Sequence, residues 1–225
     1  MHLRTLSRTH LGLPILAYDF GPNDSNNKGP KILILGGVHG DEIEGIACAK
    51  ALISDFQQNF PYKIKVTVIP EMNPDGSLLN RRTNSRGVDL NRNMATRDWS
   101  PEVKSERYHP GPSPMSEVEN QVLAEELKTT HFVLSLHSWH PVINVNGNCL
   151  EQAQVLAAAT GYKIDSDIGY PTPGCLGTYA GIERNIPTIT YEIERGLDIK
   201  KVTQIHPAAV HKMLEFMSQK IGMKD

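Results

Sequence analysis

The sequence predicts an α/β fold in which helices cover both faces of a β-sheet. Short apolar or β-branched runs, such as 31–35 and 63–69, alternate with longer segments of helical periodicity, such as 43–56. Turn-forming residues are spread along the chain instead of being gathered in one linker, and 225 residues can bury a large core. We therefore expect residues 1–225 to form a single α/β domain.

The first half of the chain is predicted to contain two strands joined by a helix. The apolar run 31–35 ends at two glycines, and the apolar residues of 43–56 then recur at the spacing of a helix face. A second strand, 63–69, ends at a proline, and Asn-Pro-Asp-Gly at 73–76 has the composition of a turn. In open α/β sheets with this order of elements, sites gather at the carboxyl ends of the strands.

The second half opens with a long polar segment. Residues 77–115 are rich in Asn, Arg, Ser, Pro and Gly, and a segment of this length without periodicity is more often functional than idle. Ser116 and Glu119 have the spacing of a capping box, which predicts the start of a helix. The remaining elements are expected at 132–136 (strand), 152–159 (helix), 174–184 (short helix), 188–193 (strand) and 206–221 (helix).

The composition argues against several classes of protein. With 23 Lys and Arg against 25 Asp and Glu, the net charge is −2, which leaves no broad basic surface for nucleic acid or anionic lipid. No apolar run has the length of a signal peptide or a membrane span, so we expect a cytoplasmic protein without a membrane partner. Cys48, Cys149 and Cys175 lack a CxxC pair and predict neither a disulfide framework nor a thiolate metal site. Nothing in the sequence indicates the oligomeric state.

Three residues are candidate metal ligands. His39 and Glu42 follow the first predicted strand with an HxxE spacing that places an imidazole and a carboxylate about one helical turn apart. A catalytic zinc takes three such ligands plus water, and His137, directly after the strand 132–136, is the best candidate for the third. Taken singly, an HxxE pair more often marks the start of a surface helix, and a lone histidine such as His137 is more often a buried, hydrogen-bonded residue.

Four further polar residues, Arg82, Asn84, Asn91 and Arg92, lie in the segment 77–115. Arginine offers a planar, permanently charged fork for a carboxylate or an oxyanion. A solvated basic loop has a similar composition, but the run Asn91-Arg92-Asn93 comes directly after the apolar residues Val88 and Leu90. This pattern favours the rim of a site.

Glu192 is a candidate general base. The alternation of the predicted strand 188–193 places it on a polar face, opposite Ile189 and Tyr191. A carboxylate inside a buried strand is costly unless it has a partner. Beside a metal-activated water it can accept a proton and return it to a leaving amine. An edge strand with a solvated polar face is the alternative.

Taken together, these residues resemble the zinc carboxypeptidases of the M14 type. The resemblance covers residues 30–195 and rests on six elements in the family's order: His39-x-x-Glu42, Asn73-Pro-Asp-Gly76, Arg82, Gly87-Val-Asp-Leu-Asn91-Arg92-Asn93, His137-Ser138 and Glu192. It implies a three-layer α/β/α sandwich with a mixed central sheet. It also implies one Zn²⁺ per chain, bound by His39, Glu42 and His137.

The resemblance further implies a role for each remaining polar residue. Glu192 would activate the water on the zinc, and Arg82 would polarise the scissile carbonyl and stabilise the oxyanion. Asn91 and Arg92 would hold the free carboxylate beside the scissile amide, with assistance from Asn84. These roles describe the hydrolysis of a C-terminal amide bond.

Within the family, the short chain and the segment Gly169-Tyr-Pro-Thr-Pro-Gly174 most resemble the murein tripeptide amidases, which cleave γ-D-glutamyl-meso-diaminopimelate. This likeness implies a small murein peptide as substrate and the recycling of cell-wall fragments. Tyr170 is the candidate for the mobile tyrosine that covers the pocket in digestive members. Ser138 departs from the bacterial amidases, which have an acidic residue after the histidine, and is closer to the digestive carboxypeptidases.

Other functions stay open. One is a general zinc carboxypeptidase, and another is an N-acyl amino acid amidohydrolase of the aspartoacylase or succinylglutamate desuccinylase kind. The latter carries an extra β-rich domain after the catalytic glutamate, whereas residues 195–225 suffice only for a loop and a helix. A non-catalytic binding module is disfavoured because all ligands, the base and both arginines are present. Thr172, Thr178 and Glu194 are candidate polar partners for the substrate side chain.

Overall fold

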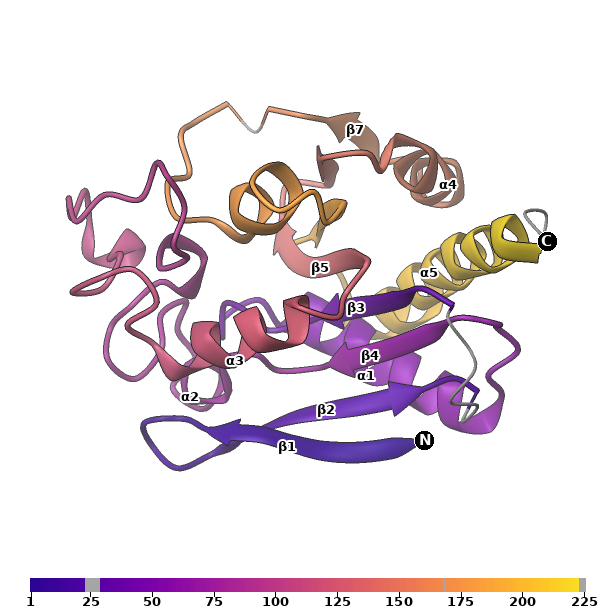
Figure 1. Ribbon diagram of the computed structural model, residues 1–225, viewed down its shortest axis with the longest axis horizontal. Helices are drawn as coiled ribbons and strands as arrows, with labels where there is room; N and C mark the ends of the chain where they lie inside the picture. The colour runs from indigo at the N-terminus through magenta and orange to yellow at the C-terminus, as the bar shows by residue number, and fades with distance from the viewer. Residues whose placement is uncertain (23–28, 168, 223–225) are drawn as a thin grey trace.

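In the part of the chain that the structure describes, an eight-stranded mixed sheet organises the fold (Figure 1). The computed structural model describes residues 1–22, 29–167 and 169–222. Across the sheet, the strands lie in the order β1-β2-β4-β3-β5-β8-β6-β7. Their bounds are β1 (His2–Arg8), β2 (Pro14–Phe20), β3 (Lys31–Leu35), β4 (Lys65–Ile69), β5 (Phe132–Trp139), β6 (Val142–Asn146), β7 (Lys163–Asp165) and β8 (Thr188–Glu194).

The centre of the sheet is parallel. β4, β3, β5 and β8 run in one direction, whereas β2 and β6 pair antiparallel with the outer two of these strands. The chain continues from β3 to β4 on one side, while β5 flanks β3 on the other. This arrangement makes the carboxyl ends of β3 and β5 a switch point, where open α/β sheets bind their ligands. The expected α/β fold with a mixed sheet is therefore confirmed.

Helices cover both faces of the sheet, as Figure 1 shows. α1, α4 and α5 pack on one face and α3 on the other. The longer helices are α1 (Ile43–Gln58), α3 (Val118–Leu127), α4 (Leu150–Thr160) and α5 (Ile199–Gly222). The shorter helical segments are α2 (Pro74–Leu78), η1 (Leu90–Arg92), η2 (Glu106–Tyr108) and η3 (Gly177–Ile182). No helix in the described ranges combines the length and apolar character needed to cross a bilayer.

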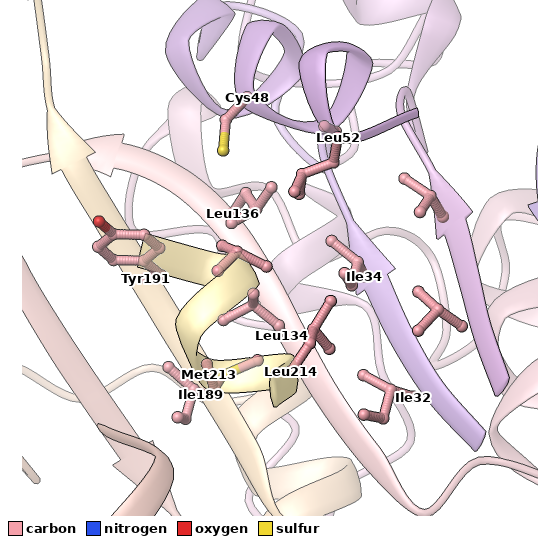
Figure 2. Close-up of a cluster of buried hydrophobic side chains, with 14 of the residues drawn as sticks. Ile32, Ile34, Cys48, Leu52, Leu134, Leu136, Ile189, Tyr191, Met213 and Leu214 are labelled. Carbon is pink, nitrogen blue, oxygen red and sulfur yellow. The ribbon is translucent and has the colours of Figure 1, made fainter. Parts of the chain in front are cut away.

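Two hydrophobic clusters hold the layers together. Successive strand residues point to opposite faces, so Ile34 joins the cluster under α1 and α5 whereas Leu35 joins the one under α3. Figure 2 shows Leu52 of α1 and Leu214 of α5 packed over the first of these faces. Cys48 is buried in the same cluster, as expected for a cysteine that acts as a small apolar residue.

Four strands of the described part of the chain escaped prediction, and all four lie toward the edges of the sheet. β1 and β2 form a hairpin at one edge of the sheet, and many of its side chains keep contact with solvent. β7 has three residues and forms the other edge. β6 carries Asn144 and Asn146, which interrupt its apolar pattern because both side chains line a cavity.

Two helix starts also differ from prediction. Asn73 begins a short helix instead of a turn, because its side-chain oxygen accepts a hydrogen bond from the Gly76 backbone N–H at 2.8 Å. The prediction of a capping box at Ser116 is wrong. The Ser116 hydroxyl donates to the Glu117 side chain at 2.7 Å, and α3 begins after Glu117 without a side-chain cap. Glu119 is instead buried against Asn84.

The last helix begins at Ile199, earlier than the predicted start at His206. Asp198 precedes this start, and its carboxylate accepts hydrogen bonds from the backbone N–H groups of Lys200 and Lys201 at 3.0 and 3.3 Å. Pro207 lies inside the helix and does not end it. The strand β5 likewise extends beyond its predicted end, so His137 lies within the strand and not after it.

His206 makes the stability of the fold depend on pH. It is buried against Tyr191, whose hydroxyl lies 2.5 Å from Nδ1, and Nε2 has no partner among the described residues. Burial lowers the pKa of His206 from 6.5 to about 4, because a charged imidazole would lose its hydration there. We therefore expect the contribution of neutral His206 to stability to be fully present above pH 6.5 and to fall as pH drops toward 4, by up to about 3 kcal/mol.

We expect urea unfolding to show this loss in the unmodified chain and a smaller loss in H206Q, which has no group that titrates in this range. The difference between the two proteins in unfolding free energy should change by about 2 kcal/mol between pH 7 and pH 5. Equal pH dependence in both proteins would contradict the assignment to His206.

Candidate active site

The candidate site lies at the carboxyl ends of three neighbouring parallel strands. His39 follows β3, His137 lies in β5, and Glu192 lies in β8 directly opposite His137 in the strand register. Glu42 comes from the turn between β3 and α1. The sheet topology thus brings together side chains that are distant in sequence.

Two glycines allow this close approach. At Gly40, a Cβ atom would lie 2.0 Å from the Gly76 carbonyl carbon, so the loop between β3 and α1 meets α2 only without a side chain. At Gly45, a Cβ atom would lie 2.5 Å from the Leu136 carbonyl oxygen, so α1 packs directly on β5. The second contact brings Glu42, just before α1, against His137.

His39, Glu42 and His137 form one buried group. Glu42 Oε1 lies 2.8 Å from His39 Nδ1, and Glu42 Oε2 lies 2.8 Å from His137 Nδ1. The two Nδ1 atoms are 3.2 Å apart, and one ligand atom from each residue lies within 4.8 Å of the others. Two imidazole nitrogens and a carboxylate that face one small space are the donor set of a catalytic zinc. These residues therefore fit the metal that the sequence predicts.

Asp89 orients the first of these histidines. Its Oδ1 lies 3.1 Å from His39 Nε2, which leaves Nδ1 of the imidazole directed at Glu42 and His137. Its Oδ2 accepts a hydrogen bond from Arg82 Nε at 2.9 Å. Burial disfavours the charged carboxylate, but Arg82 and His39 outweigh it and hold the pKa of Asp89 well below its usual range.

The charges of the ligand group are stabilised mutually. Burial disfavours the anion of Glu42, yet His39 and His137 hold its pKa well below the usual range. Burial and Arg82 disfavour the imidazolium of His39, but Glu42 and Asp89 outweigh them and raise its pKa. The site is thus built to keep Glu42 as a carboxylate.

Glu192 lies next to this group, but its pKa is shifted in the opposite direction from that of Glu42. Burial raises its pKa to about 7, with a further contribution from the charge of Glu42, while His137 and Arg82 act in the opposite direction. Its Oε2 atom is buried and makes no hydrogen bond to any described residue. A half-buried carboxyl with one buried, unpartnered oxygen and a pKa near neutrality is suited to accept and return a proton.

Two arginines line the same cavity. Arg82 and Arg92 both contact the ring of Tyr108, with guanidinium carbons 5.2 and 5.4 Å from its centroid. Arg92 donates to the Asn91 carbonyl at 2.6 Å, and the Asn91 side-chain oxygen accepts from the Leu176 backbone N–H at 2.9 Å. These contacts direct the expected substrate-binding residues Asn91 and Arg92 into the cavity.

The cavity has a volume of about 420 Å³. Tyr170 lies at its wall and is 42% exposed, with its ring perpendicular to that of Trp139 at 5.8 Å. Thr172 and Thr178 line the cavity, whereas Glu194 is exposed and does not. Side chains that the sequence analysis did not propose also line it, chiefly Asn144, Asn146, Thr190, Tyr108, Arg107 and Arg195.

Asn84 lies outside this cavity. It is fully buried, and its side-chain NH₂ donates to Glu117 at 2.8 Å. Its side-chain oxygen accepts from the backbone N–H groups of Arg86 and Val88 at 3.1 and 3.0 Å. Asn84 thus ties the loop that carries Arg82 to the start of α3, and the structure does not bring it to the other candidate residues.

Sequence reasoning missed the roles of Asp89 and Tyr108. Asp89 lies in the Asp-Leu-Asn-Arg segment already singled out, and metal-bound histidines commonly pair with a carboxylate, so an acidic residue in a segment expected at the site is a usable signal. Tyr108 lies in an irregular segment without periodicity, and nothing in its local pattern distinguishes it. Its role depends on the two arginines that pack on it.

Comparison with known proteins agrees with this geometry. Residues 1–156 match the family model described as zinc carboxypeptidase. Murein peptide amidase A of Vibrio campbellii (strain ATCC BAA-1116) is 33% identical over 201 residues, which are 81% of this chain and 75% of the relative. Murein peptide amidase A of Escherichia coli (strain K12) is 30% identical over 201 residues, which are 82% of this chain and 78% of the relative.

Solved structures show the same fold. The murein-tripeptide amidase MpaA from Escherichia coli O157 superposes with a TM-score of 0.75 at 25% identity, covering 97% of this chain and 92% of that one. Bovine thrombin-activatable fibrinolysis inhibitor superposes with a TM-score of 0.80, covering 97% of this chain and 90% of that one. The second structure is 19% identical and shows a common fold alone.

Proposed function

This chain belongs to the zinc carboxypeptidase family, and we propose that it hydrolyses the amide bond between γ-D-glutamate and a terminal meso-diaminopimelate in murein peptides. One observation carries the hydrolytic part: a buried His-Glu-His group shares its cavity with Arg82, Arg92 and the Glu192 carboxyl, whose buried Oε2 has no hydrogen-bond partner among the described residues. The substrate class is supported by the relatives named murein peptide amidase. The cytoplasmic location expected from the sequence completes the proposal, since it suits recycling of wall fragments.

We assign one Zn²⁺ per chain to His39, Glu42 and His137. Zinc, when bound, supplies a water of lowered pKa and a Lewis acid for the scissile carbonyl. Glu192 accepts a proton from the attacking water and delivers it to the leaving nitrogen. Arg82 donates to the carbonyl oxygen as negative charge develops on it.

Recognition of the leaving residue falls to other groups. Arg92 and Asn91 hold the free carboxylate next to the scissile amide, and Tyr170 covers the cavity from its exposed wall. Asn144, Asn146 and Thr190 offer uncharged donors and acceptors inside the cavity. Such groups suit the amine and carboxylate at the far end of diaminopimelate. We propose that Asn84 does not contact the substrate and instead supports the loop that carries Arg82.

The role of Arg92 predicts a substrate-dependent defect. We expect R92A to lower kcat/KM about 100-fold on peptides that end in a free carboxylate, because a charge-assisted hydrogen-bond pair is lost. The loss of kcat/KM on peptides with an amidated C-terminus should be several times smaller. The kcat/KM of R92K on free peptides should lie between that of R92A and that of the unmodified protein. Equal losses on free and amidated peptides would remove Arg92 from carboxylate binding.

The function itself is tested by product analysis. The zinc-loaded protein is incubated with L-Ala-γ-D-Glu-meso-diaminopimelate and with ordinary α-linked peptides, and release of the terminal residue is followed by mass spectrometry. We expect diaminopimelate to be released much faster than ordinary C-terminal residues. Comparable release from all peptides would indicate a general carboxypeptidase. No release from any of them, with zinc bound, would overturn the proposal and favour N-acyl amino acids as substrates.

A further inference from the structure

Two arginines of the cavity have no role in the scheme above. Arg107, in η2, and Arg195, directly after β8, both line the cavity together with Arg82 and Arg92. Their side chains are 47% and 40% exposed, against 11% for Arg82. They therefore form its solvent-facing rim, where a substrate group would meet them first.

Asp41 holds this pair in place. Arg195 Nη2 donates to Asp41 Oδ2 at 2.8 Å and to the Asp41 carbonyl at 3.0 Å. Arg107 approaches the same carboxylate oxygen at 3.4 Å through both terminal nitrogens. Asp41 lies between the ligands His39 and Glu42 in the chain, so the two guanidinium groups are anchored beside the metal group.

This arrangement leaves hydrogen-bond donors available. Each guanidinium group offers five N–H donors, and Asp41 accepts from only part of them. The charges of Glu42 and Glu44 also act on Arg195, but among the described residues neither carboxylate accepts a hydrogen bond from its side chain. Within the described part of the chain, the side-chain hydrogen bonds of Arg195 use Nη2 alone. Its remaining donors are free to meet an anion, and a planar fork is suited to a carboxylate.

The γ-glutamyl bond supplies such an anion on the acyl side. In this linkage the side-chain carboxyl of glutamate forms the scissile amide, so its α-carboxylate stays free. An ordinary α-linked peptide has no carboxylate at this position. Arg92 and Asn91 are already assigned to the carboxylate of the leaving residue, so the acyl-side carboxylate needs a second basic site.

We propose that Arg195 and Arg107, anchored by Asp41, bind the free α-carboxylate of the γ-linked glutamate and so select γ-glutamyl over α-linked substrates. The inference rests on the proposed function and extends it from the leaving residue to the acyl residue. Arg195 is the principal contact, since it has the shorter bond to Asp41 and lies three positions after Glu192. Arg107 adds a second guanidinium group at the same Asp41 oxygen.

The test compares two substrates that differ in this carboxylate alone. One is L-Ala-γ-D-Glu-meso-diaminopimelate, and the other is its isoglutamine analogue, in which the α-carboxylate is a carboxamide. We expect the unmodified protein to prefer the carboxylate by about 10- to 100-fold in kcat/KM. In R195Q the preference should collapse to within about threefold, and R107Q should reduce it partly.

Two further variants separate binding from folding. R195K keeps the charge without the fork and should retain part of the preference. R97Q removes an exposed arginine that does not line the cavity, and it should keep the full preference. Zinc content, measured on every variant, shows that the metal group is intact.

The outcomes distinguish this inference from the proposed function. Release of diaminopimelate from both substrates at equal rates by the unmodified protein would overturn the acyl-side site and leave the proposed function standing. Equal losses on both substrates in R195Q would also overturn it. Release from neither substrate by the unmodified, zinc-loaded protein would instead overturn the proposed function on which the inference rests.

Discussion

Replacing Glu192 with glutamine is expected to lower kcat by about 10²- to 10⁴-fold, because general acid-base catalysis is lost. Zinc binding should be retained, since Glu192 is not among the three residues whose ligand atoms converge. Glutamine has nearly the same shape and cannot accept the proton from water. Steady-state kinetics on the tripeptide and metal analysis of the same sample check both parts.

E194Q provides a matched control for this substitution. Glu194 lies in the same strand, two positions further on, but it is exposed and does not line the cavity. We expect its kcat to stay within about twofold, since surface substitutions away from a site have small effects. Undiminished turnover in E192Q, or loss of its zinc, would exclude Glu192 as the base.

Replacing Arg82 with alanine is expected to lower kcat by about 10²- to 10³-fold, the usual effect of losing one oxyanion donor. The guanidinium is held by Asp89 at 2.9 Å and lies 3.5 Å from Glu42, so it is fixed before substrate arrives. Because this interaction strengthens in the transition state, KM should change little. A defect confined to KM would assign Arg82 to substrate binding instead.

R82K tests whether charge alone suffices. Lysine restores a positive charge but not the planar fork that contacts Asp89 through Nε. We expect partial recovery of kcat relative to R82A. Metal content should be compared among these variants. Without Arg82, the Asp89 carboxylate keeps His39 as its main partner, and His39 is one of the proposed zinc ligands.

The metal group is the part of the site that could be predicted most fully. His39 and Glu42 follow a strand, His137 and Glu192 lie near the carboxyl ends of two others, and the carboxyl ends of parallel strands meet at one edge of a sheet. Residue type, order and position relative to strands were sufficient to place these four side chains together. The helix α1 was equally predictable, since its apolar spacing reports directly on its buried face.

The loop residues were less predictable. Asn84, Asn91 and Arg92 lie in one irregular segment, yet two line the cavity and one is buried under α3. An irregular segment has no periodicity, so the direction of each side chain depends on the elements that pack against it. For Asn84 these are the start of α3 and the turn at Arg86 and Val88.

Sequence motifs alone thus indicated the chemistry proposed for this protein: a zinc-type donor set, a carboxylate base and basic residues for an anionic substrate. Tertiary structure decided which polar residues meet, including the contact of Asp89 with His39 and the convergence of Arg107 and Arg195 on Asp41. The last three residues come from separate segments of the chain. Contacts of this kind depend on distances between elements, and these are set by the packing of the sheet, helices and loops and not by local pattern.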